Sequence, residues 1–217
     1  MKQTRPFLAL AFLLCSVPLL HAQGSFDVAL GFGTAHDKAT GLGIDENTLN
    51  SCTPSSTDLT CKATPSLGGL FMGFSGDGML NKHIGIGGEF KFQPSKDDYG
   101  PLEYRQIFYD FDGIYAPIND KRVQLRILGG IGGTRSGFSY SQTACVGTAV
   151  CTTQTLSVGN SSHFQVHLGA GVQIYLASHF FIRPQFDFYQ VPGLTNQFGN
   201  DHVIGGTVWI GYNFGEM

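Results

Sequence analysis

The residues of this chain that could carry chemistry are charged side chains placed within alternating apolar and polar segments. In an extended segment every second side chain points to the same face, so these acids and bases gather on one face. Such groups can conduct ions or protons, or they can pair with one another as internal salt bridges. We expect pairing, and the residues concerned are Asp27, Glu89, Lys91, Asp110, Asp112, Arg126, Arg183 and Asp187.

Two histidines lie close to serines, a combination that can support nucleophilic catalysis. Ser161 and Ser162 come directly before His163, and His167 shares the face of His163. A catalytic site needs a nucleophile, a base and an orienting acid within reach of one another. No serine stands two residues after either histidine, which is the spacing usual in lipid-deacylating membrane enzymes. We therefore expect no catalytic site, no metal site and no cofactor.

The N-terminal residues resemble a secretory signal. Lys2 and Arg5 precede an apolar stretch from Phe7 to Leu20, and Ala22 offers a small residue for cleavage. This order predicts a signal peptide over residues 1–22 and a mature domain over residues 23–217. The remainder has no apolar run of the roughly 20 residues that a helical span needs. Without Lys2 and Arg5 the chain has 11 basic and 16 acidic residues, which argues against nucleic acid as a partner.

Four cysteines remain after the predicted cleavage point, in two pairs. Export to an oxidising compartment favours disulfides, and the chain has no CxxC or CxxH motif of the kind that binds zinc. We predict one disulfide within each of two connecting segments, Cys52 with Cys61 and Cys145 with Cys151.

Eight segments alternate between apolar and polar residues with the period of two that strands require. Their polar faces carry glycine, glutamine and a few charges, where a soluble sandwich would expose many lysines and glutamates. Only 13% of the chain is charged, against about 25% in soluble domains. The pattern therefore predicts that the apolar faces meet lipid and the polar faces fill a lumen. The segments span residues 26–33, 69–75, 84–92, 106–115, 123–132, 164–174, 180–188 and 203–214.

Aromatic residues on the apolar faces are expected to form two belts, one at each membrane interface, around an aliphatic band. The first belt contains Phe26, Phe74, Tyr115, Phe180, Tyr212 and Phe214, and the second contains Phe32, Phe92, Phe164 and Phe188. The fold class that follows is all-β, an eight-stranded antiparallel up-and-down transmembrane β-barrel.

Short and long connections alternate along the chain, as they do in barrels with short periplasmic turns and longer extracellular loops. We expect short turns near residues 76–78, 119–120 and 177–179, and long loops over residues 35–66, 94–103, 135–162 and 190–201. The second turn suggests a register in which Ala116 faces Arg122, which would make Asp112 and Arg126 neighbours across two strands. Pro184 cannot donate a ladder hydrogen bond, so we expect a bulge there.

The chain resembles the OmpA/OmpX-like family of small outer-membrane β-barrels over residues 23–217. The likeness is carried by Met79-Leu80-Asn81-Lys82-His83 before Gly85-Ile86-Gly87-Gly88, by Phe181-Ile182-Arg183-Pro184-Gln185, and by the last strand. In that family the last strand is read by the barrel-assembly machinery, and the corresponding residues are Val208, Ile210, Tyr212 and Phe214. The resemblance implies insertion into the outer membrane, with lipid and the assembly machinery as partners.

For function, we expect a non-enzymatic barrel that anchors disulfide-braced loops. These loops would serve adhesion, surface interaction or envelope integrity and could meet an extracellular ligand, because loops on rigid scaffolds often carry binding. The second hypothesis is a narrow channel for ions or small solutes, and the third is a lipid-modifying enzyme. Paired lumen charges favour the first hypothesis, because the interior of an eight-stranded barrel is filled by side chains.

Overall fold

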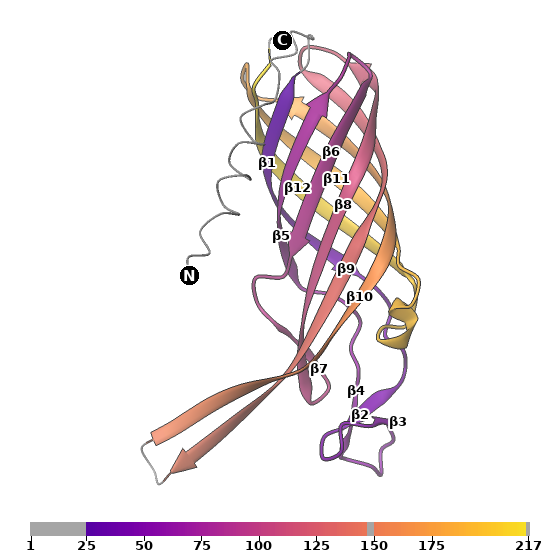
Figure 1. Cartoon of the computed structure of the whole chain (residues 1–217), viewed down its shortest axis with the longest axis vertical. Coiled ribbons are helices and arrows are strands. Elements are labelled where there is room, and N and C mark those ends of the chain that lie inside the picture. The colour runs from indigo at the N-terminus through magenta and orange to yellow at the C-terminus, as the bar shows by residue number, and fades with distance from the viewer. Residues whose placement is uncertain (1–24, 147–149, 216–217) are drawn as a thin grey trace, which may run out of the picture.

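The computed structural model describes residues 25–146 and 150–215, and the predicted signal peptide lies outside them. Within these residues, eight long antiparallel strands form a closed barrel (Figure 1). Neighbouring strands pair in the order β6-β5-β1-β12-β11-β10-β9-β8, and pairing of β6 with β8 closes the ring. The predicted fold is confirmed. The strands are β1 (Phe26–His36), β5 (Leu70–Met79), β6 (Ile84–Phe92), β8 (Leu102–Asn119), β9 (Val123–Val146), β10 (Val150–Tyr175), β11 (Phe180–Gln190) and β12 (His202–Asn213).

The two faces of each barrel strand differ as a membrane environment requires. Leu30 and Ile210 leave 52% and 54% of their area exposed on the outer face, whereas Arg126 on the inner face is fully buried. Apolar residues therefore face outward and polar residues inward, the reverse of a soluble protein. None of the described helical segments is long and apolar enough to cross a membrane.

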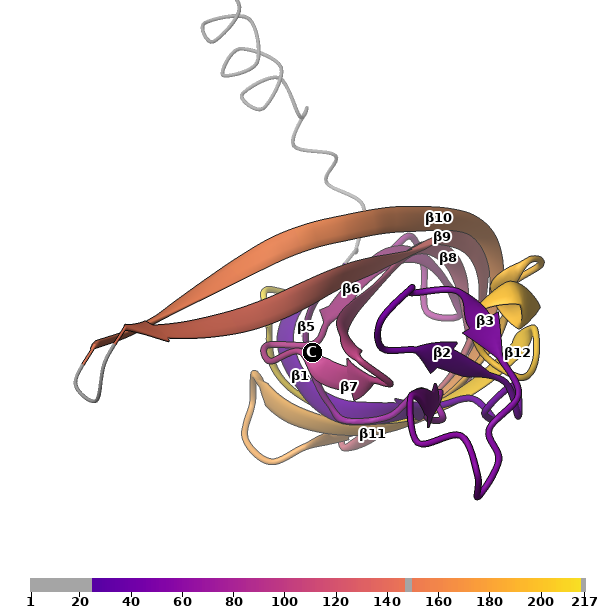
Figure 2. The same cartoon turned by 90° about the horizontal axis from the view of Figure 1, so that it is seen from below.

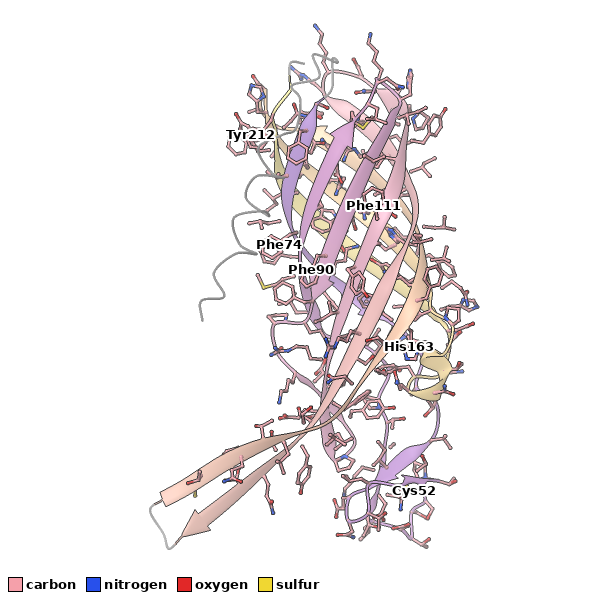
Figure 3. All side chains as sticks on the ribbon, viewed as in Figure 1. Cys52, Phe74, Phe90, Phe111, His163 and Tyr212 are labelled. Carbon is pink, nitrogen blue, oxygen red and sulfur yellow. A yellow bond between two sulfur atoms is a disulfide. The ribbon has the colours of Figure 1, made fainter. Side chains whose placement is uncertain are left out.

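The aromatic residues form belts less strictly than the sequence suggests. Phe74 pairs with Leu30 on one side and with Phe90 on the other, in the middle of all three strands. Figure 3 accordingly shows Phe74 and Phe90 at mid-height, while Tyr212 lies near the end with the short turns. The assignment of Phe74 to a rim belt was wrong because β5 continues beyond the predicted turn.

That turn is displaced along the chain. Residues 76–78 lie within β5, which ends only at Met79, and the reversal occurs at residues 80–83. The Asn81 carboxamide oxygen accepts hydrogen bonds from the backbone of His83 and Ile84, at 2.8 and 2.9 Å, and so stabilises the turn. A Gly-Asp-Gly sequence is compatible with a turn and with an extended strand, and here the longer ladder prevails. Asp77 consequently points into the lumen.

The connection predicted as a loop over residues 135–162 is largely regular. β9 and β10 continue beyond the barrel as a two-stranded hairpin, which leans away from the barrel axis (Figures 1 and 2). Threonine favours strands because its branched side chain fits a pleated surface. Hydroxyl pairs also join the two strands, Ser141 with Thr155 at 3.1 Å and Thr143 with Thr153 at 2.9 Å.

The other long connections carry small elements that lie over one mouth of the barrel, seen from that side in Figure 2. The first contains a three-stranded sheet of β2 (Gly43–Asp45), β3 (Ser51–Cys52) and β4 (Cys61–Ala63). The second contains β7 (Asp97–Tyr99), and the last contains the 3-10 helix η1 (Leu194–Asn196). The three connections thus make a cap at the end opposite the short turns.

Pro184 produces no bulge. Gly171 pairs with Gln185 and Ile174 with Ile182, so the register between β10 and β11 is the same on both sides of the proline. The predicted bulge was wrong, because a missing amide donor can be tolerated without inserting a residue.

Candidate functional site

All eight charged residues predicted to share a face lie inside the barrel and are at least nine-tenths buried. Two further residues complete the group. Asp77 was assigned to a turn from the sequence, and His167 was considered there only as part of a catalytic site. The structure thus brings six carboxylates, three permanent cations and one histidine into one interior, counted over the described residues.

The half of this interior nearer the short turns centres on two arginines. The Arg126 guanidinium donates to Asp27 at 2.7 Å and to Asp77 at 2.8 Å. Arg183 donates to the same oxygen of Asp77 at 2.6 Å, and its other terminal nitrogen lies 3.4 Å from Glu89. These shared contacts tie together five strands, because arginine presents several donors in a fixed plane.

The predicted contact between Asp112 and Arg126 was wrong. Asp112 pairs with Gly130, four positions further along β9 than the short turn suggested. The last ladder pair before the turn is Asn119 with Gln124, and the register shifts between Tyr115 and Ile118. This irregularity, invisible in the alternation pattern, keeps both charges inside the barrel but gives them different partners.

The other half of the interior centres on Lys91 and His167. The Lys91 ammonium lies 2.6 Å from Asp187 and 2.7 Å from Glu89, and it donates to the Tyr189 hydroxyl. His167 stacks on Tyr189 with a centroid separation of 4.8 Å, and its two ring nitrogens contact Asp112 and Asp187. Trp209 lies between the halves, 5.4 Å from Lys91 and 5.5 Å from Arg183, measured to its ring centroid.

Apolar side chains close the interior above and below these charges. On the side of the short turns, Met79, Ile114 and Leu128 form one buried cluster, and Phe181 packs with Trp209 in another. At the opposite mouth the capping connections and the strand ends share a larger cluster. It contains Ala35, Leu67, Phe71, Tyr99, Leu102, Tyr104, Phe108, Tyr189, Val191, Leu194, Phe198 and Val203. Apolar clusters thus lie at both ends of the charged interior.

The cap is tied together by hydrogen bonds as well as by packing. The Tyr99 hydroxyl donates to the Gln197 carbonyl, and the Gly68 amide donates to the Tyr104 hydroxyl at 3.1 Å. Burial raises the pKa of Tyr99 to about 12, so this hydroxyl stays protonated. In the first connection, the Thr60 and Thr48 hydroxyls donate to Asp45 and lower the pKa of its carboxyl to about 2. The cap is therefore a folded structure.

A pocket of about 260 Å³ opens between the four long connections. Its lining is uncharged and mixes aromatic rings with hydroxyl and amide groups, drawn from the three capping connections and the hairpin. The lining residues include Ile44, Thr64, Tyr99, Phe138, Asn196 and Gln197. Neutral surfaces of this kind recognise ligands through hydrogen bonds and apolar contact.

The cysteines lie in these connections. Cys52 and Cys61 form a disulfide between β3 and β4, with a Cα–Cα distance of 6.0 Å. Figure 3 places Cys52 at the far end of the cap. The backbone register sets Cys151 opposite Cys145, but the Cys145 side chain lies outside the described residues. The second disulfide therefore stays a prediction.

The serines near His163 do not form a catalytic arrangement in the described structure. The Ser161 hydroxyl accepts a hydrogen bond from Gln197 at 2.5 Å, and His163 Nε2 is buried without a hydrogen-bond partner. His167 contacts carboxylates instead of a serine. A nucleophile, base and acid are thus not linked by hydrogen bonds within residues 25–146 and 150–215.

The last strand carries the aromatic residues predicted to be read during assembly. Val208, Ile210 and Phe214 expose about half or more of their area on the outer face. Tyr212 makes edge contacts with Phe180 and Phe214, at centroid distances of 5.0 and 4.8 Å. These side chains form an outward apolar row that meets lipid in the inserted barrel.

A closed barrel with an apolar exterior and a polar interior defines an integral outer-membrane β-barrel protein. The chain belongs to the outer membrane protein beta-barrel domain family, whose model matches residues 7–214. The predicted resemblance is confirmed, and the family places the protein in the cell outer membrane. No curated protein matched the chain significantly.

Solved structures show the same fold at low identity. Ail, the attachment invasion locus protein of Yersinia pestis, in complex with the heparin analogue sucrose octasulfate, is 13% identical, with a TM-score of 0.52. The match covers 88% of this chain and 99% of Ail. OprG from Pseudomonas aeruginosa is 12% identical, with a TM-score of 0.49, over 88% of this chain and 96% of OprG. The neisserial surface protein NspA is 10% identical, with a TM-score of 0.47, over 88% and 96%.

Proposed function

We propose that this protein is a non-enzymatic anchor that presents its folded cap and its long hairpin for contacts at the cell surface. The observation that carries the proposal is the filled interior: paired charges occupy the lumen, and apolar clusters lie at both of its ends. A barrel closed in this way supports what is attached to it and is poorly suited to conduction.

The attached parts favour contact with an external partner. The disulfide between Cys52 and Cys61 and the buried rings of the cap hold the connections in a defined shape. A pre-organised surface binds with less loss of conformational entropy than flexible loops do. The hairpin of β9 and β10 extends the same surface away from the barrel.

The charges of these connections indicate the chemistry of the partner. Residues 37–69, 93–105, 136–162 and 191–201 contain four basic and eight acidic residues, and the hairpin segment 136–162 has no charged residue. A sulfated ligand such as the one bound by Ail would need clustered lysines and arginines. We therefore infer that the partner is met through neutral polar and apolar contacts, and we do not extend the Ail ligand to this chain.

Two measurements test the proposal. Residues 139–157 are replaced by Asn-Gly, which shortens the hairpin and leaves the barrel ladder in place. Attachment of bacteria expressing either form is measured on glass and on cultured epithelial cells. We expect the intact protein to raise attachment and the shortened form to lose that gain. A control carries Asn-Gly in place of residues 177–178, in a short turn.

The purified protein is also reconstituted in planar lipid bilayers. We expect no stable single-channel currents. Stable currents from the unmodified protein would favour a channel over an anchor. Attachment that is unchanged by shortening the hairpin would show that the hairpin makes no surface contact.

Two steps of biogenesis are also proposed. We propose cleavage after Ala22 and recognition of the last strand by the barrel-assembly machinery. The outward row of Val208, Ile210, Tyr212 and Phe214 supports the second step. N-terminal sequencing of the protein extracted from outer membranes tests the first.

A further inference from the structure

Two carboxylates in the lumen have no permanent cation as a partner. Lys91 contacts Glu89 and Asp187, while Arg126 and Arg183 contact Asp27, Asp77 and Glu89. Among the described residues these contacts engage all three lumen cations. Asp110 and Asp112 are left with His167 as their basic neighbour, so two carboxyl groups are buried beside one imidazole.

Unpaired oxygen atoms mark the same place. Asp110 Oδ1 and Asp112 Oδ2 are both buried without a hydrogen-bond partner. An anionic oxygen buried in this way is costly unless a cation or a proton neutralises it. His167 Nδ1 lies 2.9 Å from Asp112 Oδ1 and 3.7 Å from Asp110 Oδ1, so the three side chains converge on one point.

Asp112 on β8 and His167 on β10 can meet because β9, the strand between them, carries a glycine at the position where a side chain would separate them. Asp112 pairs with Gly130 of β9, and Gly130 pairs with His167 of β10. A Cβ atom at Gly130 would collide with the Asp112 carboxylate. The glycine therefore leaves the space in which the acid and the imidazole meet.

The His167 ring is fixed in orientation through Nε2, the nitrogen that points away from Asp110 and Asp112, as in many metal sites. His167 Nε2 lies 3.1 Å from Asp187 Oδ1, and the ring stacks on Tyr189. A histidine that donates one N–H to a carboxylate is fixed in orientation, and its other nitrogen presents a lone pair to a metal ion. Here that nitrogen is Nδ1, which faces Asp112 and Asp110.

We propose that Asp110, Asp112 and His167 form a binding site for one divalent transition-metal ion of the zinc class. Ligands about 2.0–2.1 Å from a tetrahedral zinc lie roughly 3.3 Å apart, between the two distances measured from Nδ1. Calcium and magnesium fit less well, because these ions prefer a shell of oxygen atoms. The two charges of the ion balance the two unpaired carboxylates.

The position of the site predicts how the ion would enter. The apolar cluster with Phe108 and Tyr189 covers the interior on the side of the cap. An ion bound during folding would therefore exchange slowly, and a chelator added to the folded protein would remove it slowly. This site is independent of the proposed surface role, since its residues lie inside the barrel wall.

The test refolds the urea-unfolded mature chain into detergent with zinc chloride or with EDTA. Folding is followed by the heat-dependent shift on gel electrophoresis, and bound zinc is measured by mass spectrometry after an EDTA wash. We expect about one zinc per folded wild-type chain, and less than about a tenth of that for His167→Gln and for Asp110→Asn. Should His167→Gln fail to fold, Asp110→Asn carries the comparison. His163→Gln and His202→Gln, which change histidines outside the cluster, should retain the ion.

Refolding with cobalt adds a spectroscopic readout. A visible absorption band that is present in the wild type and absent in Asp110→Asn would support the site. Wild-type protein that folds with zinc and retains none after the wash would overturn the proposal and leave a shared proton as the neutralising group. Zinc retained equally by folded His167→Gln or Asp110→Asn would place the ion elsewhere and would also overturn it.

Discussion

Asp77 and Arg126 are 49 residues apart in sequence, and in the barrel Asp77 Oδ2 accepts a hydrogen bond from the Arg126 guanidinium at 2.8 Å. The same oxygen also accepts one from Arg183 at 2.6 Å. One carboxylate oxygen on β5 thus joins two arginines from β9 and β11, and the first predictions concern this junction.

Replacing Asp77 by Asn should destabilise the barrel strongly. Two buried guanidinium groups lose their shared anion, and breaking a buried ion pair on one side typically costs about 3–5 kcal/mol. Urea unfolding of the refolded barrel measures the change. The matched control is Asp98→Asn in the exposed part of β7, which should stay within about 0.5 kcal/mol of the wild type. Equal effects at the two positions would contradict the structure.

Double-mutant cycles should separate the observed partners of Arg126 from the partner predicted by the sequence. Removal of Asp77 and Arg126 together should cost less than the sum of the two single changes, because the groups touch. Removal of Asp112 and Arg126 should be additive within about 0.5 kcal/mol. Coupling in the second cycle and additivity in the first would restore the register predicted from the short turn.

Asp37 should make the cap less stable as the pH rises. Burial raises the pKa of this carboxyl from 3.8 to about 6, so the folded state holds its proton more tightly than the unfolded state. The stabilisation is complete below about pH 4 and is lost as the pH rises through about 6. Asp37→Asn should remove this dependence and exceed the wild type in stability at pH 7.

Amide hydrogen exchange of residues 37–40 measures the effect, comparing the variant with the wild type at each pH so that intrinsic exchange cancels. A variant that loosens the cap at pH 7 would show that the charged form of Asp37 is the favoured one.

Changing Cys52 and Cys61 to serine should loosen the first connection and leave the barrel intact. A disulfide closing a loop this short contributes roughly 2–3 kcal/mol, mainly by restricting the unfolded loop. Limited proteolysis should cut faster within residues 43–63, while the urea midpoint of the barrel stays unchanged. Non-reducing peptide mapping of the wild type should recover the linked pair. A shift in the urea midpoint of the barrel would show instead that the disulfide stabilises the barrel strands.

An epitope inserted after Ser56 should be accessible to antibody on intact cells, whereas one inserted after Lys121 should be accessible only after the outer membrane is opened. The capping connections and the short turns lie at opposite ends of the barrel, so one set must face the exterior. The reverse labelling pattern would invert the orientation of the whole protein.

The strands could be predicted because alternation of apolar and polar residues directly reflects which face meets lipid. All eight predicted segments overlap the observed barrel strands. The exact turn could not be predicted at Gly76-Asp77-Gly78, because glycine and aspartate fit a turn and a strand alike. That ambiguity concealed Asp77, which is the anion shared by two arginines.

The lumen charges could be identified, but their partners could not. A shift of the register by an even number of residues keeps every side chain on the same face, so alternation cannot detect it. The contact between Lys91 and Asp187 crosses the barrel, and the convergence of Asp110, Asp112 and His167 depends on Gly130 between two strands. The first relation follows from ring closure and the second from the register of β8, β9 and β10, and local sequence carries no information on either.

The hairpin of β9 and β10 carries uncharged residues away from the rest of the molecule (Figure 1). Beyond Ser139 the two strands continue alone for about seven residues, roughly 23 Å at 3.3 Å per residue. Repulsion between charged surfaces decays over a Debye length of about 8 Å at physiological ionic strength. The described end of the hairpin thus lies nearly three such lengths beyond the last neighbouring strand, and contacts made there should be insensitive to salt.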